Sequence, residues 1–108
     1  MESQLAGLNV IDFATLTVSS TAVSLADATP ALTNNKIGGK TVRRIFVTCE
    51  TDAVRWRADG TAPTSSVGHV MAAASSLSFT GANYKHLIAN IQFIKVTNDA
   101  TLSITYFD

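Results

Sequence analysis

The 108-residue sequence contains few charged residues: Asp, Glu, Lys and Arg make up 15% of it, and the formal net charge is zero. Proteins that bind nucleic acid through its phosphates normally carry an excess of Lys and Arg, so this class is not supported. The single cysteine, Cys49, cannot form an intramolecular disulfide. No apolar run approaches the roughly 20 residues of a transmembrane helix. The first residues lack a basic segment followed by an apolar run, so we expect no secretory signal.

Residues that would form a catalytic or metal site are also sparse. The two histidines, His69 and His86, have no Cys, His or carboxylate at the spacing of a zinc site. There is no nucleophile elbow, and the few acids lie mostly in turn-like segments. The sequence therefore predicts a protein that is not an enzyme, with no catalytic residues, no metal and no cofactor. We expect Cys49 to be a buried, reduced thiol.

Strand-forming residues are abundant in the rest of the sequence. Val, Thr and Ser are frequent, whereas Lys, Glu and Gln, which are typical of surface helices, are scarce. Short apolar segments are separated by turn-forming residues, and no long helical period is present. We predict an all-β fold, an antiparallel β-sandwich or jelly roll of about 8 short strands. Residues 1–108 would form a single β-sandwich domain, with residues 1–7 a candidate for an extended N-terminal arm.

The stretch 42–70 carries the strongest local pattern. Two segments rich in β-branched and aromatic residues, 42–50 and 53–57, flank the turn-forming pair Thr51 and Asp52. This order predicts a β-hairpin. Because side chains alternate between the two faces of a strand, a loop with an even number of residues would put one apolar set on the core face. That set is Ile45, Val47, Cys49, Val54 and Trp56.

The other face of this predicted hairpin would bring three arginines close to an aromatic side chain. Its residues include Arg44, Phe46, Arg55 and Arg57. Arg and aromatic residues are favoured in protein–protein contacts, so these four residues are a candidate interface. The alternative is a solvated face on which Arg57 covers Phe46 and Glu50 pairs with an arginine, an exposed pair worth about 0–1 kcal/mol.

The segment after Trp56 has the composition of a long turn. Asp59 and Gly60 supply a left-handed residue at little cost, and Pro63 restricts one backbone angle. Gly68 precedes the point at which the chain returns to the sheet. We therefore expect Trp56, Asp59, Gly60, Pro63 and Gly68 to shape the core and this turn.

Three further segments predict strands. Residues 76–80 alternate, with Leu77 and Phe79 on one face, and residues 102–106 alternate as a terminal strand. Residues 86–97 form the longest apolar run, which predicts a central strand covered on both faces or a bent strand that serves two sheets. The inward-facing candidates outside the hairpin are Leu16, Val18, Val23, Leu25, Leu102, Ile104 and Tyr106.

The turn and the later strands also carry a resemblance. Residues 54–64, Val-Arg-Trp-Arg-Ala-Asp-Gly-Thr-Ala-Pro-Thr, and then Val67-Gly68-His69 combine an arginine-flanked aromatic, an Asp-Gly-Thr-x-Pro-Thr turn and a following glycine. Segments 77–79, 91–96 and 101–106 follow as a short strand, a longer apolar strand and a Thr-Leu-Ser-Ile-Thr-Tyr strand. This order resembles a pattern in small virion proteins of tailed bacteriophages and prophages, and it covers residues 42–107.

The resemblance implies a β-sandwich or jelly-roll structural protein of the virion. The most similar function is that of capsid decoration or cement proteins, which bind between major-capsid subunits and stabilise the shell. The implied partners are the major capsid protein and further copies of the same chain, as a homodimer or homotrimer, with no nucleic acid and no membrane. The protein would be synthesised in the bacterial host cytoplasm and would lie on the capsid surface of the virion.

Two alternative functions remain open. A tail, baseplate or head–tail connector module would also be structural, but it would occupy another part of the virion. A carbohydrate-binding β-sandwich module would need an exposed aromatic platform from Trp56 or Tyr84. Core packing is the favoured role of Trp56 and Tyr106, because both lie on predicted core faces.

Overall fold

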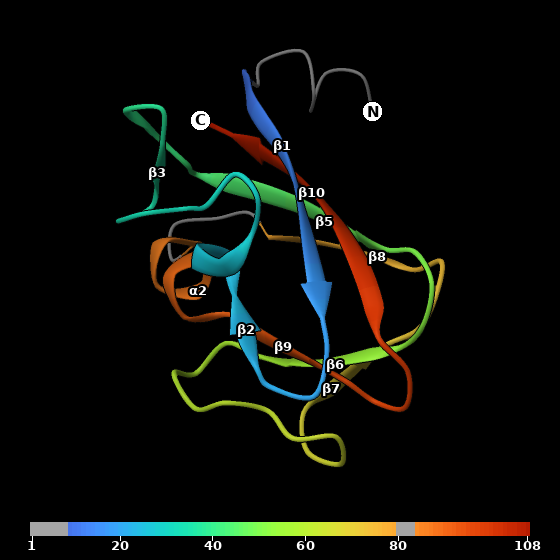
Figure 1. The fold of residues 1–108 in the computed structure, drawn as a ribbon. Coiled ribbons are helices and arrows are strands. Elements are labelled where there is room, and N and C mark those ends of the chain that lie inside the picture. Colours follow the sequence, from blue (N-terminus) through green and yellow to red (C-terminus); the bar gives the residue numbers. More distant parts are fainter. Residues whose placement is uncertain (1–8, 80–83) are drawn as a thin grey trace.

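Two four-stranded antiparallel sheets pack against each other in the computed structural model, which describes residues 9–79 and 84–108 (Figure 1). Sheet A has the strand order β1 (Val10–Val18), β10 (Ala100–Phe107), β5 (Arg44–Cys49) and β8 (Ser76–Phe79). Sheet B has the order β2 (Val23–Ser24), β9 (Gln92–Lys95), β6 (Val54–Arg57) and β7 (His69–Met71). A small hairpin of β3 (Lys36–Ile37) and β4 (Lys40–Thr41) turns at Gly38 and Gly39, which both have positive φ. The predicted all-β sandwich is confirmed.

The strand pairs are nested along the chain. β1 pairs with β10, β2 with β9, β5 with β8 and β6 with β7, all antiparallel. Two further pairs, β10 with β5 and β9 with β6, complete the sheets. Such nesting is what results when one long antiparallel ribbon is rolled up so that successive nested pairs fall alternately in the two sheets. This is the topology of a jelly roll.

The predicted hairpin between residues 42–50 and 53–57 is wrong. β5 lies in sheet A between β10 and β8, whereas β6 lies in sheet B between β9 and β7. The Glu50 N–H still donates to the Thr101 carbonyl in sheet A, and the Ala53 carbonyl already accepts from the Val96 N–H beside sheet B. The chain therefore crosses between the sheets at residues 51–52. The alternating pattern specifies which face of a strand is buried, but it does not specify the strand's hydrogen-bonding partner.

The core nevertheless contains the residues that the alternation predicted. Both sheets direct one face to the same interior, so Ile45, Val47 and Cys49 from β5 meet Val54 from β6, and all four are buried. Trp56 is partly buried and packs against this cluster, as do Val23, Leu77 and Phe79. The other inward candidates are fully buried: Leu16, Val18, Leu25, Leu102, Ile104 and Tyr106. Facing sheets satisfy the pattern as well as a hairpin would.

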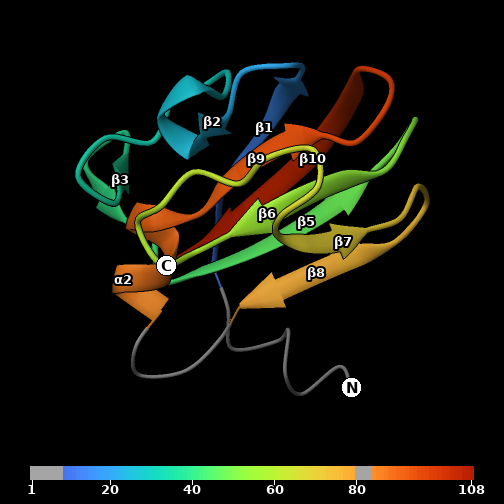
Figure 2. The same cartoon turned by 90° about the horizontal axis from the view of Figure 1, so that it is seen from below.

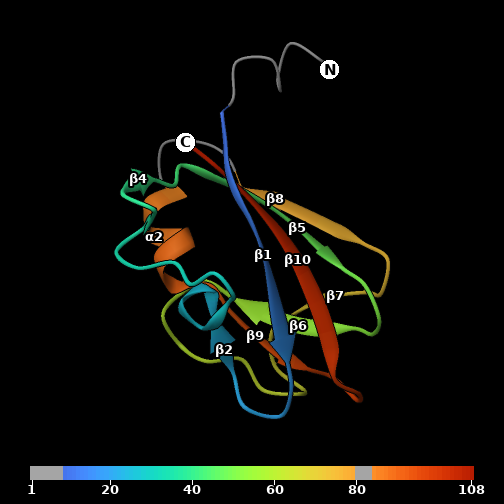
Figure 3. The ribbon, with the colours of Figure 1, turned by 45° about the horizontal axis from the view of Figure 1, so that its top comes forward.

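Residues 86–97 do not form a single strand, contrary to the prediction. The chain forms helix α2 (Tyr84–Asn90) before β9 begins. Ile88 and Ile91 are three residues apart and both buried, so one helical turn presents them to the core. The Ile91 N–H donates to the Leu87 carbonyl at 2.9 Å. α2 covers one end of the sandwich (Figure 3).

Near the beginning of the described chain, Ser24 caps a 3-10 turn, η1 (Leu25–Asp27), and Asp27 completes a capping box. The backbone of Thr29, just beyond η1, pairs with Thr15 on the free edge of β1. This contact partly covers that sheet edge. The candidate arm at residues 1–7 lies outside the described residues.

Candidate interaction surfaces

The outward-facing side chains of sheet A lie in rows across its four strands. The strand register defines a central pair of rows. One row contains Phe13, Thr105, Phe46 and Ser78, and the next contains Thr15, Ser103, Thr48 and Ser76. The flanking rows contain Val10, Phe107 and Arg44 on one side and Thr17, Thr101 and Glu50 on the other. We call this surface the outer A face. Its rows present hydroxyl groups and apolar side chains, and among these described residues charge lies only at the two ends of β5.

The apolar side chains of the outer A face are largely exposed. Val10, Phe13 and Phe46 have exposed fractions of 64%, 55% and 41%. In Figure 3 no described helix or loop crosses the face. Exposed apolar side chains within a broad, nearly uncharged surface are typical of sites that another protein covers.

The outer face of sheet B differs because a loop, residues 58–68, lies over it (Figure 2). Arg55 extends from β6 and donates two hydrogen bonds to loop carbonyls. Its Nε donates to Ser65 at 3.0 Å, and its Nη1 donates to Gly68 at 2.7 Å. The guanidinium of Arg55 is therefore committed to holding the loop on the sheet.

Gly68 allows the loop to return close to β6. Its φ is +139°, and a Cβ at this position would lie 3.1 Å from the Trp56 carbonyl oxygen and 3.2 Å from the Cβ atoms of Arg55 and Pro63. A side chain there would crowd three neighbours and would also strain the backbone. Pro63, which belongs to the same loop, is itself buried. Gly68 and Pro63 therefore lie in contact where the loop returns to β6.

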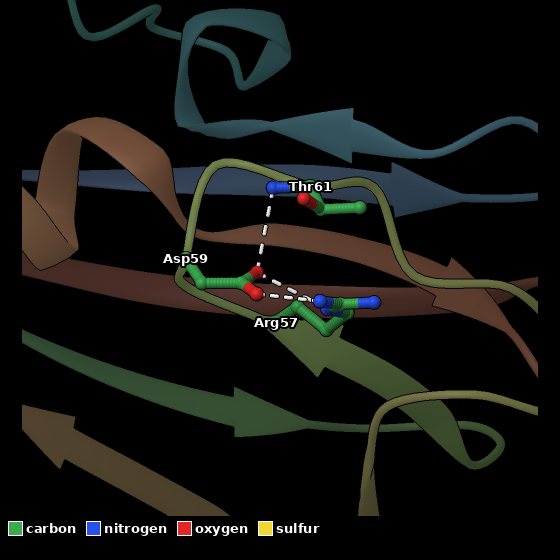
Figure 4. Close-up of polar contacts among 3 residues, drawn as sticks. All are labelled: Arg57, Asp59 and Thr61. Carbon is green, nitrogen blue, oxygen red and sulfur yellow. Dashed lines mark hydrogen bonds and ion pairs between the residues drawn. The ribbon is translucent and has the colours of Figure 1, made fainter.

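Asp59 organises the start of the same loop (Figure 4). Arg57 donates to it through Nε (3.1 Å to Oδ1) and Nη2 (2.5 Å to Oδ2), and the Thr61 N–H donates to Oδ1 at 3.3 Å. The hydrogen bond from Arg57 is the main cause that lowers the pKa of the Asp59 carboxyl, and it raises the pKa of Arg57 in return. Gly60 follows with φ of +88°, as expected of an Asp-Gly turn.

A shallow hollow of about 450 Å³ opens between the end of β6 and the start of β7. It is lined by Trp56, Arg57, Ala58, Asp59, Val67, Gly68 and His69. The indole of Trp56 stacks at a tilt on the ring of His69, with 4.7 Å between centroids, and meets Phe79 edge-on at 5.5 Å. Trp56 thus packs against the core and also lines a surface depression, which alternation alone does not indicate.

The four residues predicted as one interface lie on opposite sides of the molecule. Arg44 and Phe46 belong to the outer A face, and Arg55 and Arg57 belong to the outer side of sheet B. The prediction failed because it assumed that β5 and β6 share a sheet. The neighbours that join Phe46 come instead from the first and last strands: Val10, Phe13, Thr105 and Phe107. The alternating Thr and Ser residues of 101–105 were a signal that this face would be polar and uncharged.

The two histidines and Cys49 do not belong to a metal-binding group among the described residues. Both histidines are exposed, His69 on β7 and His86 on α2. Cys49 is buried as expected; its Sγ donates to the Asp52 carbonyl at 2.7 Å, and burial raises the pKa of the thiol. Within residues 9–79 and 84–108, no three His, Cys, Asp or Glu side chains gather where they could hold a metal ion.

We found no match to this chain among protein-family models, curated proteins or solved structures. In the part of the chain that the structure describes, no helix has both the length and the apolar composition to cross a bilayer. The fold and the geometry of the outer faces are therefore the basis for assigning a function.

Proposed function

We propose that this protein is a structural component of a multi-copy protein assembly, and specifically a capsid decoration or cement protein of a tailed bacteriophage. The observation that carries the proposal is the outer A face, where no other described residues cover Phe13, Phe46 and the hydroxyl side chains, and where the described rows carry charge only at their ends. The resemblance of residues 42–107 supplies the virion setting. Jelly rolls occur in viral capsid domains, which supports the proposal by analogy of fold.

The function would follow from selective binding alone. A cement protein binds the assembled lattice and not the free subunit, so its binding free energy stabilises the assembled state. At a free concentration of 100 times Kd, each occupied site contributes about 2.7 kcal/mol. Many equivalent sites on one shell would sum this effect, without any chemistry in the protein itself.

Particles of the phage that encodes the chain provide the test. A tagged chain expressed during infection should co-purify with DNA-filled particles through a density gradient, in the hundreds of copies expected of a shell protein. A dozen copies or fewer would favour the tail, baseplate or connector alternative. Absence from purified particles would refute both virion assignments.

A matched pair of variants tests the role of the outer A face. Phe46→Glu and Val70→Glu each place a carboxylate at an exposed apolar strand position, the first on the outer A face and the second on β7 of sheet B. We expect Phe46→Glu to reduce incorporation into particles at least about tenfold, because burying an unpaired charge costs more than 1.4 kcal/mol. Equal incorporation of the two variants would remove the outer A face from the proposal.

Carbohydrate binding is the second candidate, and the hollow at Trp56 favours it. The Arg57–Asp59 pair offers hydrogen-bond donors and acceptors but little net charge beside an indole, which suits the hydroxyls and apolar ring faces of a neutral saccharide. Trp56 is the only tryptophan in the sequence, so its fluorescence reports on this hollow alone. Neutral oligosaccharides that leave the emission unchanged at millimolar concentration would exclude this function.

A further inference from the structure

We infer that the outer A face binds a second copy of this chain, with the two β5 strands antiparallel across a two-fold axis. The inference rests on the proposed use of this face for a protein contact, but it does not depend on the virion. Sheets that pack face to face keep their strands within about 30° of parallel or antiparallel, so two outer A faces can lie against each other. Distribution of charge along β5 then decides between the possible symmetric arrangements.

The two ends of β5 carry opposite charge. Near its start the described residues include four cations and two acids: Lys36, Lys40, Arg43, Arg44, Asp12 and Asp108. Near its end they include three acids and one cation: Glu50, Asp52, Asp99 and Lys95. Figure 1 shows the β3–β4 hairpin beside the start of β5, and the turn that joins β9 to β10 towards its other end. Of these, Arg44 and Glu50 belong to the rows of the outer A face itself, so the face has a positive residue at one end and a negative residue at the other.

Only one in-plane two-fold axis pairs unlike charges. An axis parallel to the strands would place Arg44 near Arg44 of the second copy, and Glu50 near Glu50. An axis perpendicular to the strands, crossing β5 at Val47, places Arg44 opposite Glu50 of the second copy and repeats this pair by symmetry. Each exposed pair is worth only about 0–1 kcal/mol, so its main effect is to select the arrangement by penalising the alternative.

The same axis makes the central rows complementary. The row that contains Phe13 and Phe46 comes to lie over the row that contains Thr15 and Thr48 of the second copy. Each phenyl ring then meets threonine methyl groups, and the serine and threonine hydroxyls remain able to hydrogen-bond within or across the contact. No charged residue belongs to either central row, and the Glu50 carboxylate that borders them accepts a hydrogen bond from the Ser103 hydroxyl, so the contact buries no unpaired charge.

The area is sufficient for a modest dimer. Four strands at about 4.8 Å spacing and rows that span about seven residues give about 19 by 23 Å, or about 450 Å² on each copy. The total of about 900 Å² is close to the 1,000 Å² at which specific interfaces begin. We therefore expect a dissociation constant in the micromolar range, and a dimer that would bind a repetitive lattice with two equivalent sites.

Sedimentation equilibrium of the purified chain, from about 1 to 500 μM, measures this association. The expected mass rises with concentration from 11.4 kDa to twice that value. Arg44→Glu and Glu50→Arg should each raise the dissociation constant at least tenfold, whereas the double variant, with both charges exchanged, should restore it. Phe46→Glu should abolish the dimer, and Val70→Glu on sheet B should leave it intact. Thermal melting of each variant confirms that it is folded.

A wild-type chain that stays at 11.4 kDa throughout this range would overturn the inference. Failure of the double charge exchange to restore association would also overturn it, because the antiparallel pairing predicts that rescue. A monomer whose Phe46→Glu variant is still lost from particles would mean that the face binds the lattice directly. In that case the proposed function would stand while this inference fails.

Discussion

Removal of the Arg55 side chain should detach the 58–68 loop from sheet B while the rest of the sandwich remains folded. Arg55 donates to the carbonyls of Ser65 and Gly68 at 3.0 and 2.7 Å. A hydrogen bond from a charged group contributes about 1.5–3 kcal/mol when partly buried, and an exposed one contributes less. The loop gains conformational freedom when it is released, which offsets part of the loss. We therefore expect Arg55→Ala to lower the free energy of unfolding by about 2 kcal/mol.

Two measurements check this value. Urea unfolding followed by Trp56 fluorescence gives the global change, and amide hydrogen exchange of residues 59–68 gives the local one. Arg43→Ala is the matched control, because Arg43 is exposed and no side-chain hydrogen bond of it is observed among the described residues. Arg55→Lys should recover only part of the stability, since an ammonium group lacks the planar fork that spans two carbonyls. Unchanged exchange in 59–68, with stability equal to that of Arg43→Ala, would refute this role of Arg55.

Three further changes test the packing and the ion pairs. Tyr106→Phe should leave stability unchanged or raise it by about 1 kcal/mol in thermal melts, because the buried hydroxyl has no hydrogen-bond partner among the described residues. A loss of stability larger than about 1 kcal/mol would show that the hydroxyl does have a stabilising partner. Gly68→Ala should destabilise by about 1–3 kcal/mol and by more than Gly60→Ala, since a Cβ at Gly68 meets three close neighbours, whereas one at Gly60 meets only the Asn90 Oδ1, at 4.0 Å. The reverse order would show that the loop adjusts. The pKa values of Asp59 and Asp99 are lowered, chiefly by hydrogen bonds from Arg57 and Lys95. The two ionised carboxylates therefore stabilise the folded state above the unfolded pKa of about 4, and this contribution is lost as the pH falls through the lower pKa values of the folded state. The free energy of unfolding of the double variant Asp59→Asn/Asp99→Asn should therefore lie below that of the wild type at neutral pH and become equal to it at low pH. A difference that stays constant at all pH values would point to another cause.

Much of the local structure was predictable from single residues. The alternation of Leu102, Ile104 and Tyr106 predicted a terminal strand with these three side chains in the core, and β10 buries all three. Gly68 was assigned to the segment that returns to the sheet, and its positive φ and close neighbours lie where the loop meets β6. These properties depend on neighbours within a few residues, so the sequence carries them directly.

The helix at 84–90 was missed for an equally local reason. Leu87, Ile88 and Ile91 fit one helical turn as well as a strand, and a stretch of seven residues is too short for periodicity to distinguish the two. Packing of Ile88 and Ile91 against the end of the sandwich decided between them. The candidate interface was divided for a different reason. The surface on which Arg44 and Arg55 lie depends on which strands β5 and β6 pair with, and that pairing is not a local property.

By itself, the sequence determined which side chains avoid water, where the chain turns and that strands dominate the fold, because alternation and turn preferences are properties of short segments. Only the tertiary structure decided that β5 and β6 face each other across the core and that Phe46 shares a surface with Phe13 from the far end of the chain. Hydrogen bonds between strands join residues that are distant in sequence, and a strand with the right faces can accept several partners. The way in which the whole chain folds into two sheets selects one set of strand partners. That selection also determines which surface remains for another protein to bind.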